Sequence, residues 1–335
     1  MQKSTSLSHQ NALLRNSAIV FAGGACYGIL ASVVKFSYAD GFSFQQLVFS
    51  QSFFALIAFT LIALFDKVRG FKRTPLKPKQ KLKLALMGIV TSGTTTFYYL
   101  SLSYIPANVA ITLLFQFTWL GLVFEVFTTR KRPTNAALLS AAIIFTGTLF
   151  ASGIIGGSAI ESLHPLGIVF GLCAAICCAS FMFLSGRVEA HLPVQQRGLW
   201  ACCGYILTGI ILCPNYFASG ALQQGIWKYG LVLGPLGFVL PMLLFGIGCK
   251  YLSPGLSTIM ASSELPISIF CAVFLLHEPT SLLQLLGVGC ILLGIVIAQI
   301  PGLRNREKPN LNFPETSIPH EYSQVPLPSN SNNFR

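Results

Sequence analysis

Residues 261–298 read ASSELPISIFCAVFLLHEPTSLLQLLGVGCILLGIVIA. This stretch predicts two apolar helices with a short turn between them, because the turn chemistry of His277-Glu278-Pro279-Thr280 divides an otherwise apolar run. The second helix is almost purely aliphatic and is expected to end at Pro301-Gly302. Two such helices in immediate succession are typical of a chain that crosses a bilayer several times.

The first of these helices carries an acidic residue, Glu264, two positions before Pro266. A carboxylate in the apolar part of a bilayer costs about 2.5–3.5 kcal/mol on insertion scales, so some interaction has to offset it. Pro266 has no backbone N–H, and its ring displaces the carbonyl of Ser262, which partly frees the backbone around Ser262 and Ser263. Two interpretations stay open. Glu264 binds a proton or a solute in a wet cavity, or it is a structural acid bonded to the Ser262 or Ser263 hydroxyl.

The composition excludes a soluble domain. Of the 335 residues, 53% are hydrophobic and 10% are charged, and the mean hydropathy is +0.67, whereas soluble domains carry about 25% charged residues. The net charge of +12 does not indicate a nucleic-acid partner, because nearly all basic residues lie in short loops and tails between apolar spans. The ten cysteines lie mostly within apolar spans and lack metal-site spacing. We therefore expect neither a metal nor a cofactor.

Three motifs carry a family resemblance. They are Glu264-Leu265-Pro266, Leu275-Leu276-His277-Glu278-Pro279-Thr280, and Leu286-Gly287 followed by Gly294. Together they resemble the last two helices of an EamA-type repeat of the drug/metabolite transporter superfamily. The resemblance implies ten transmembrane helices in two repeats, a central cavity lined by both halves, and transport of small organic solutes. It also implies an arginine early in the second span, where this sequence has Gln51, and a lysine near the position of Lys35.

The spans predict an all-α integral membrane protein with ten transmembrane helices as two inverted five-helix repeats. The expected segments are a cytoplasmic tail at 1–16, a first EamA-like repeat at 17–151, an outer connector at 152–164, a second repeat at 165–300 and a disordered cytoplasmic tail at 301–335. The halves resemble one another at a spacing of about 147 residues, which places Gln116 opposite Ser263 or Glu264. Five spans are an odd number, so the second copy enters the membrane from the opposite side.

The distribution of basic residues predicts the orientation. All but two of the 22 Lys and Arg residues fall on one side when the loops alternate from an internal N-terminus, the exceptions being Lys35 and Lys228. This bias predicts that both termini are cytoplasmic. Glu125, near the inner end of the fourth span, is expected to pair with the bases at 130–132. The short loops and the resemblance together favour a bacterial inner membrane.

Helix-breaking residues at matching places in the two halves predict where a transporter binds its solute. They are Gly88 and Gly93 in the third span, Pro235 and Pro241 in the eighth, and Pro266 in the ninth. Neutral polar and aromatic walls are common in small-molecule sites. The candidate substrate-binding or coupling residues are Glu264, Ser263, Ser262, Gln116, Trp119, Tyr98, Tyr99 and Lys35.

These features favour a secondary transporter that works by alternating access, with export of small organic metabolites such as amino acids or amphiphilic compounds as the expected activity. Lys35 is the one base expected inside the membrane, so a neutral, zwitterionic or cationic solute fits better than a multiply phosphorylated one. The expected partners are a small-molecule solute and the lipid bilayer, with protons as the candidate coupling ion and a homodimer as the candidate assembly. A membrane scaffold or accessory subunit is the alternative. An intramembrane enzyme is a weaker one, because the sequence has no HExxH, no GxSxG and no paired intramembrane aspartates.

Overall fold

The computed structural model describes residues 2–71, 74–105, 107–130, 132–151, 164–276 and 281–304. In these residues all regular secondary structure is helical, as the composition predicts, and Met1–Arg304 forms one compact unit. Most of the expected connector, the turn at 277–280 and the tail from 305 onward lie outside the described residues.

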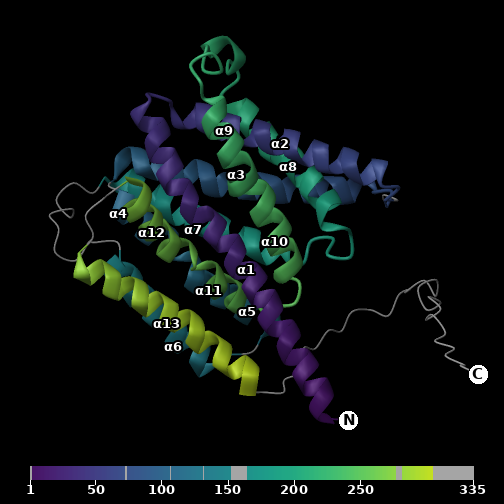
Figure 1. Cartoon of the computed structure of the whole chain (residues 1–335), viewed down its shortest axis with the longest axis vertical. Coiled ribbons are helices and arrows are strands. Elements are labelled where there is room, and N and C mark those ends of the chain that lie inside the picture. The colour runs from purple at the N-terminus through teal and green to yellow at the C-terminus, as the bar shows by residue number, and fades with distance from the viewer. Residues whose placement is uncertain are drawn as a thin grey trace, which may run out of the picture. The chain divides into compact units, whose positions relative to one another are not determined.

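The helices follow the expected spans with few departures (Figure 1). The first half contains α1 (Gln2–Ala39), α2 (Phe44–Val68), α3 (Pro78–Tyr104), α4 (Ala107–Leu114), α5 (Phe117–Thr129) and α6 (Asn135–Ala151). The second half contains α7 (Pro165–Ser185), α8 (Val194–Leu212), α9 (Trp227–Gly234), α10 (Leu240–Gly248), α11 (Pro254–Ala261), α12 (Glu264–Leu276) and α13 (Leu282–Arg304). Helix α1 begins at Gln2, well before the expected start of the first span at residue 17.

Six helices in the described part of the chain are long and apolar enough to cross a membrane. They are Asn11–Ala39, Phe44–Val68, Val109–Thr129, Pro165–Ser185, Trp227–Gly248 and Leu282–Gln299. Many large apolar side chains on these helices are exposed, including Leu61, Phe127 and Val296. Exposed apolar surface on this scale is expected where lipid rather than water surrounds the protein.

Two helix breaks repeat along the chain with the same spacing. The first separates α4 from α5, and the second separates α11 from α12. Pro254 lies 147 residues after Ala107, and Leu276 lies 147 residues after Thr129. The spacing estimated from the sequence therefore holds without the one-residue slip that it allowed, and Ser263, rather than Glu264, is the counterpart of Gln116.

At both breaks the backbone tightens to hydrogen bonds between residues three apart. In the second half the amide of Leu265 donates to the carbonyl of Ser262 at 3.4 Å, and in the first half the amide of Thr118 donates to the carbonyl of Phe115 at 3.1 Å. Pro266 explains the second break, because it offers no N–H to the Ser262 carbonyl that it would face in an unbroken helix.

Helix α3 corrects one prediction. The sequence predicts breaks at Gly88 and Gly93, whereas α3 is continuous from Pro78 to Tyr104. Gly88 serves close packing instead, because a Cβ at this position would collide with the carbonyl oxygen of Ala201 in α8. Small residues permit such close helix crossings in membrane proteins.

The predicted interruption of the eighth span lies at its first proline. Pro235 begins a π-helical turn, η3 (Pro235–Val239), which joins α9 to α10. Such turns inside a helix are frequent at functional sites. Pro241, in contrast, lies within the first turn of α10 and does not break it, because the missing N–H of a proline is tolerated at the start of a helix.

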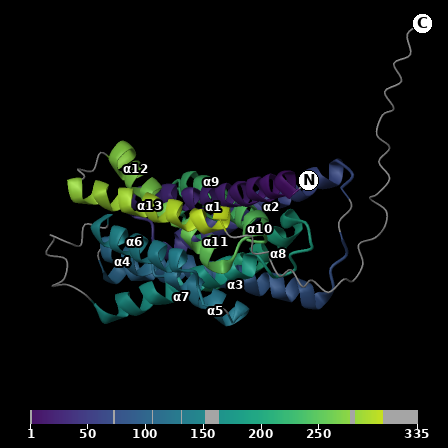
Figure 2. The same cartoon turned by 90° about the horizontal axis from the view of Figure 1, so that it is seen from below.

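Helices from the two halves pack against one another rather than forming separate bundles. Helix α6 lies along α13, α2 along α8 and α9, and α3 along α7 and α8, while α1 contacts α10, α11 and α12. Figure 2 shows α1 and α12 on one side of α11, with α3, α5 and α7 on the other. Side chains from both halves therefore face a common interior.

Candidate functional site

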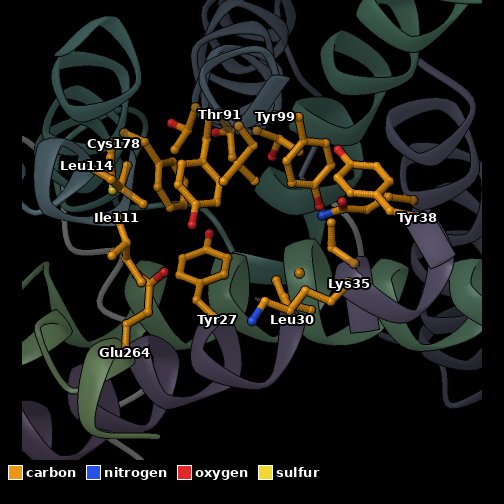
Figure 3. Close-up of a pocket in the computed structure, with 18 of the residues that line it drawn as sticks. Tyr27, Leu30, Lys35, Tyr38, Thr91, Tyr99, Ile111, Leu114, Cys178 and Glu264 are labelled. Atoms are coloured by element: carbon orange, nitrogen blue, oxygen red, sulfur yellow. The ribbon is translucent and has the colours of Figure 1, made fainter. Parts of the chain in front are cut away.

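A cavity of about 320 Å³ lies between helices of the two halves. Its wall is built from side chains of α1, α2, α3, α4, α7 and α12, together with Gly237 of the π-helical turn (Figure 3). The volume is near the lower end of the range of ~300–1,000 Å³ that is typical of ligand pockets. It suits one small organic molecule.

Glu264 reaches the cavity because the helix breaks immediately before it. It is the first residue of α12, and it lines the wall opposite Ile111 and Leu114 of α4. In Figure 3 its side chain enters from one end of the cavity, and Tyr27 of α1 lies between Glu264 and Lys35. Glu264 is partly buried, so its carboxylate lies in a largely apolar setting and is available to a solute.

Two neighbouring serines have other partners than Glu264. The Ser263 hydroxyl donates to the backbone carbonyl of Phe21 in α1 at 2.7 Å. The Ser262 hydroxyl lies 3.1 Å from that of Thr118 and 3.2 Å from the carbonyl oxygen of Thr258. A hydroxyl has one proton to donate, so these bonds remove the donors that a purely structural role for Glu264 would need. The two serines fix the break instead of lining the cavity.

One face of α1 supplies much of the wall. Tyr27, Leu30, Val34 and Tyr38 all line the cavity, and their spacings of three and four residues place them on one side of a helix. The sequence analysis did not single out this face. Its signal is the recurrence of tyrosine at helical spacing. Lys35 also lines the cavity, with an exposed side chain.

Helix α3 supplies the opposite wall. Tyr98 and Tyr99 line the cavity, as the run of aromatics predicts, and Thr91, Thr94 and Thr95 join them. The threonine run, which the sequence suggested as a helix break, thus provides hydroxyls to the wall within a continuous helix.

Gln116 and Trp119 are placed away from the cavity, contrary to the prediction. The Trp119 indole N–H donates to Oε1 of Gln116 at 2.6 Å, and Nε2 of Gln116 donates to the carbonyl of Thr112 at 3.1 Å. The Trp119 side chain is 45% exposed, which is acceptable for an amphipathic ring at a lipid-facing surface. The cavity takes a different glutamine, Gln51, which is buried and lines the wall.

The cavity is bordered at one end by a polar contact between α5 and α11. Oε2 of Glu125 accepts hydrogen bonds from the Ser253 hydroxyl at 2.9 Å and from the Gly255 amide at 3.1 Å. Deeper in the same interface the Thr258 hydroxyl donates to the carbonyl of Thr118 at 3.1 Å. The expected pairing of Glu125 with bases 130–132 did not include this contact with the start of α11, where the helix dipole favours a carboxylate.

The other end differs. Helices α5 and α11 pack closely, but the described residues of α4 and α12 make no comparable contact. Ile111 and Leu114 of α4 and Glu264 of α12 instead face the cavity. The cavity therefore separates the half-helices α4 and α12, while their counterparts α5 and α11 close against each other.

Within the described residues no group of three or more His, Cys, Asp or Glu side chains could hold a metal ion. The chemistry of the cavity is that of one carboxylate, one amine, an amide, hydroxyls and aromatic rings.

Comparison with known proteins gives a consistent picture. The model of the EamA-like transporter family matches twice, over residues 16–153 and 165–299. Among curated proteins, the chain is 23% identical over 252 residues to "Probable purine permease 5" of Arabidopsis thaliana, covering 67% of each chain. It is 26% identical over 222 residues to the "Threonine/homoserine exporter RhtA" of Escherichia coli (strain K12), covering 64% of this chain and 70% of that one.

One solved crystal structure has a similar fold, with a TM-score of 0.68 at 19% identity, covering 85% of this chain and 98% of the other. This likeness concerns the fold alone.

Proposed function

Because this chain belongs to the EamA-like transporter family, we propose that it is a secondary-active transporter that exports small organic metabolites, such as amino acids or amphiphilic compounds, by alternating access. The observation that carries the proposal is the cavity, which is shared by both halves and has the Glu264 carboxylate at one end. The relative whose name is "Threonine/homoserine exporter RhtA" supports the direction, and the relative named as a purine permease supports the breadth of the solute class.

The architecture we propose is ten spans in two inverted repeats. Helices α4 and α5 form one span, as do α9 with α10 and α11 with α12. The support is the recurrence of the helix break at 147 residues, at the same bounds on both sides. The repeat boundaries expected from the sequence, 17–151 and 165–300, stay our proposal for the domains.

Alternating access is supported by the difference between the two ends. An inverted repeat has two equivalent arrangements, in which the roles of the halves are exchanged. Closure of α5 against α11, with α4 and α12 apart, corresponds to one of them. The exchanged arrangement would close α4 against α12 and open the end at α5 and α11.

The closed end is the cytoplasmic one in this proposal. Arg130 and Arg132 follow α5, and Lys250 precedes α11, so the positive-inside bias places this end in the cytoplasm. Both termini are then cytoplasmic, and the cavity faces the outside. A bacterial inner membrane is the proposed location, and protons are the proposed coupling ion, through Glu264.

The test compares cells that overproduce the wild type, Glu264→Gln, or Glu189→Gln as the control. Glu189 is bonded to Gln80 and Lys83 outside the cavity, so its substitution changes a carboxylate without touching the site. Metabolites are profiled in the cells and in the medium. We expect one or more solutes to be depleted inside and enriched outside with the wild type and Glu189→Gln, but not with Glu264→Gln. Equal profiles for all three proteins, at equal expression, would contradict the transporter proposal and favour a membrane scaffold.

A further inference from the structure

Gln51 is a buried polar group that faces the cavity with an unused acceptor. Its side chain is 1% exposed, it lines the cavity, and its Oε1 atom has no hydrogen-bond partner among the described residues. Burying an acceptor without a partner is unfavourable unless something supplies a donor. The missing donor must come from whatever occupies the cavity.

The position of the Gln51 amide is fixed by the π-helical turn. A Cβ at Gly237 would collide with Nε2 of Gln51 and would lie 3.0 Å from Leu30. The glycine therefore leaves the space in which the amide packs, next to Leu30. In Figure 3, Leu30 lies on the far side of Tyr27 from Glu264. The neutral acceptor and the carboxylate thus stand at separate places along the wall.

The two acceptors ask for two kinds of donor. Glu264, when ionised, only accepts hydrogen bonds and favours a cation, whereas the carbonyl oxygen of Gln51 accepts from a neutral N–H or O–H. The wall between them is aromatic, with Tyr27 and Tyr98, which suits a flat apolar body or a cation over a ring. Lys35 does not reverse this balance, because its side chain is exposed and its charge is screened by solvent.

We propose that Gln51 is a specificity-determining residue that reads a neutral hydrogen-bond donor on the solute, and that the cavity takes short amines which carry such a donor at the end away from the ammonium group. This inference rests on the proposed transport function and names the solute class for the same cavity. It predicts discrimination between amines that differ only in that donor.

Tyramine and phenethylamine are a suitable pair of probes, because they share the amine and the ring and differ only in the phenol hydroxyl. Binding is measured by calorimetry on the purified full chain in lipid nanodiscs. We expect the wild type to bind tyramine about tenfold more tightly, as one buried hydrogen bond would give. Gln51→Leu should bring the two affinities within about twofold of each other, and Glu264→Gln should weaken both.

Two further variants guard the interpretation. Gln51→Glu keeps an acceptor at the same place and should retain the preference for tyramine. Gln45→Leu changes a glutamine of the same helix that does not line the cavity, and it should behave as the wild type. Should Gln51→Leu fail to fold, an unchanged preference in Gln51→Glu together with its presence in Gln45→Leu still supports the inference, and its loss in Gln51→Glu overturns it.

The outcomes separate this inference from the transport function. A wild type with no preference, or a preference that survives in Gln51→Leu, overturns the role of Gln51. Absence of binding by both amines overturns the solute class, while the metabolite profiles of the wild type and Glu264→Gln continue to decide whether the protein transports anything. Equal binding of tyramine by the wild type and Glu264→Gln would contradict both proposals at this cavity.

Discussion

Glu125 offers a direct test of whether the α5–α11 contact is a gate. Its carboxylate accepts from the Ser253 hydroxyl at 2.9 Å and from the Gly255 amide at 3.1 Å, and it lies at the start of α11. Hydrogen bonds to a charged group contribute about 1.5–3 kcal/mol each when buried, and a carboxylate at a helix N-terminus adds about 0.3–1 kcal/mol. Glu125 is partly exposed, so we discount the total for solvent screening to about 2 kcal/mol.

Glu125→Leu removes all of these interactions from one side of the equilibrium. A loss of about 2 kcal/mol shifts the balance toward the arrangement with α5 and α11 apart by roughly thirtyfold. Amide hydrogen exchange in lipid nanodiscs measures this shift, because exchange of amides protected by the contact scales with the population that is open. We expect faster exchange at the facing ends of α5 and α11, by up to roughly thirtyfold, and no increase in α4 and α12.

The matched control is Glu189→Leu. It removes the hydrogen bond from Gln80 (2.8 Å) and the ion pair with Lys83 (3.8 Å), but it leaves α5 and α11 untouched. It should therefore change neither segment. Exchange that stays within about threefold of the wild type in Glu125→Leu would refute the reasoning, as would an equal rise in every helix, because the latter reports a loss of overall stability.

Three further predictions concern packing and topology. Gly88→Val should lower the stability of the protein in detergent by about 1–3 kcal/mol, seen as a lower melting temperature, because its side chain would collide with the backbone of Ala201; an unchanged melting temperature would contradict the close crossing. Arg197→Met should destabilise by about 2 kcal/mol in the same assay, since it leaves the buried carbonyls to which the guanidinium donates without partners, whereas a neutral result would mean that water reaches these carbonyls. Single cysteines at 161 and 73, in place of Glu161 and Arg73 and in a background without native cysteines, should be labelled from outside only at 161; the reverse pattern would invert the topology.

The apolar spans and the proline at the second helix break could be predicted from the sequence for a simple physical reason. A bilayer forces every backbone group to be satisfied within its own helix, so spans stand out as long apolar runs and Pro266 stands out as a defect. Glu264 stands out in the same way, because an acid in such a run is costly. These signals are local, and one sequence suffices to see them.

The face of each helix that turns to the cavity could not be predicted as easily. In a soluble protein the polar face of a helix meets water, but in a membrane the lipid-facing side is apolar as well, so periodicity does not mark the interior. Trp119 and Tyr98 therefore looked equivalent in the sequence, although one is exposed and the other lines the cavity. The contact of Glu125 with Gly255 joins residues far apart in the chain, and no local pattern contains it.

The two halves duplicate the backbone of the break but not its side chains. The residue 147 positions before Glu264 is Phe117, which is 1% exposed, and the residue 147 positions after Glu125 is Ala272. A symmetric backbone alone would make the two arrangements of an inverted repeat equal in free energy. Because one end has a carboxylate contact and the equivalent position at the other end has an alanine, the equilibrium must be biased toward closure of α5 against α11. A solute that binds at Glu264 has to overcome this bias before the exchanged arrangement forms, so binding and reorientation are coupled through two carboxylates that have no counterparts in the repeat.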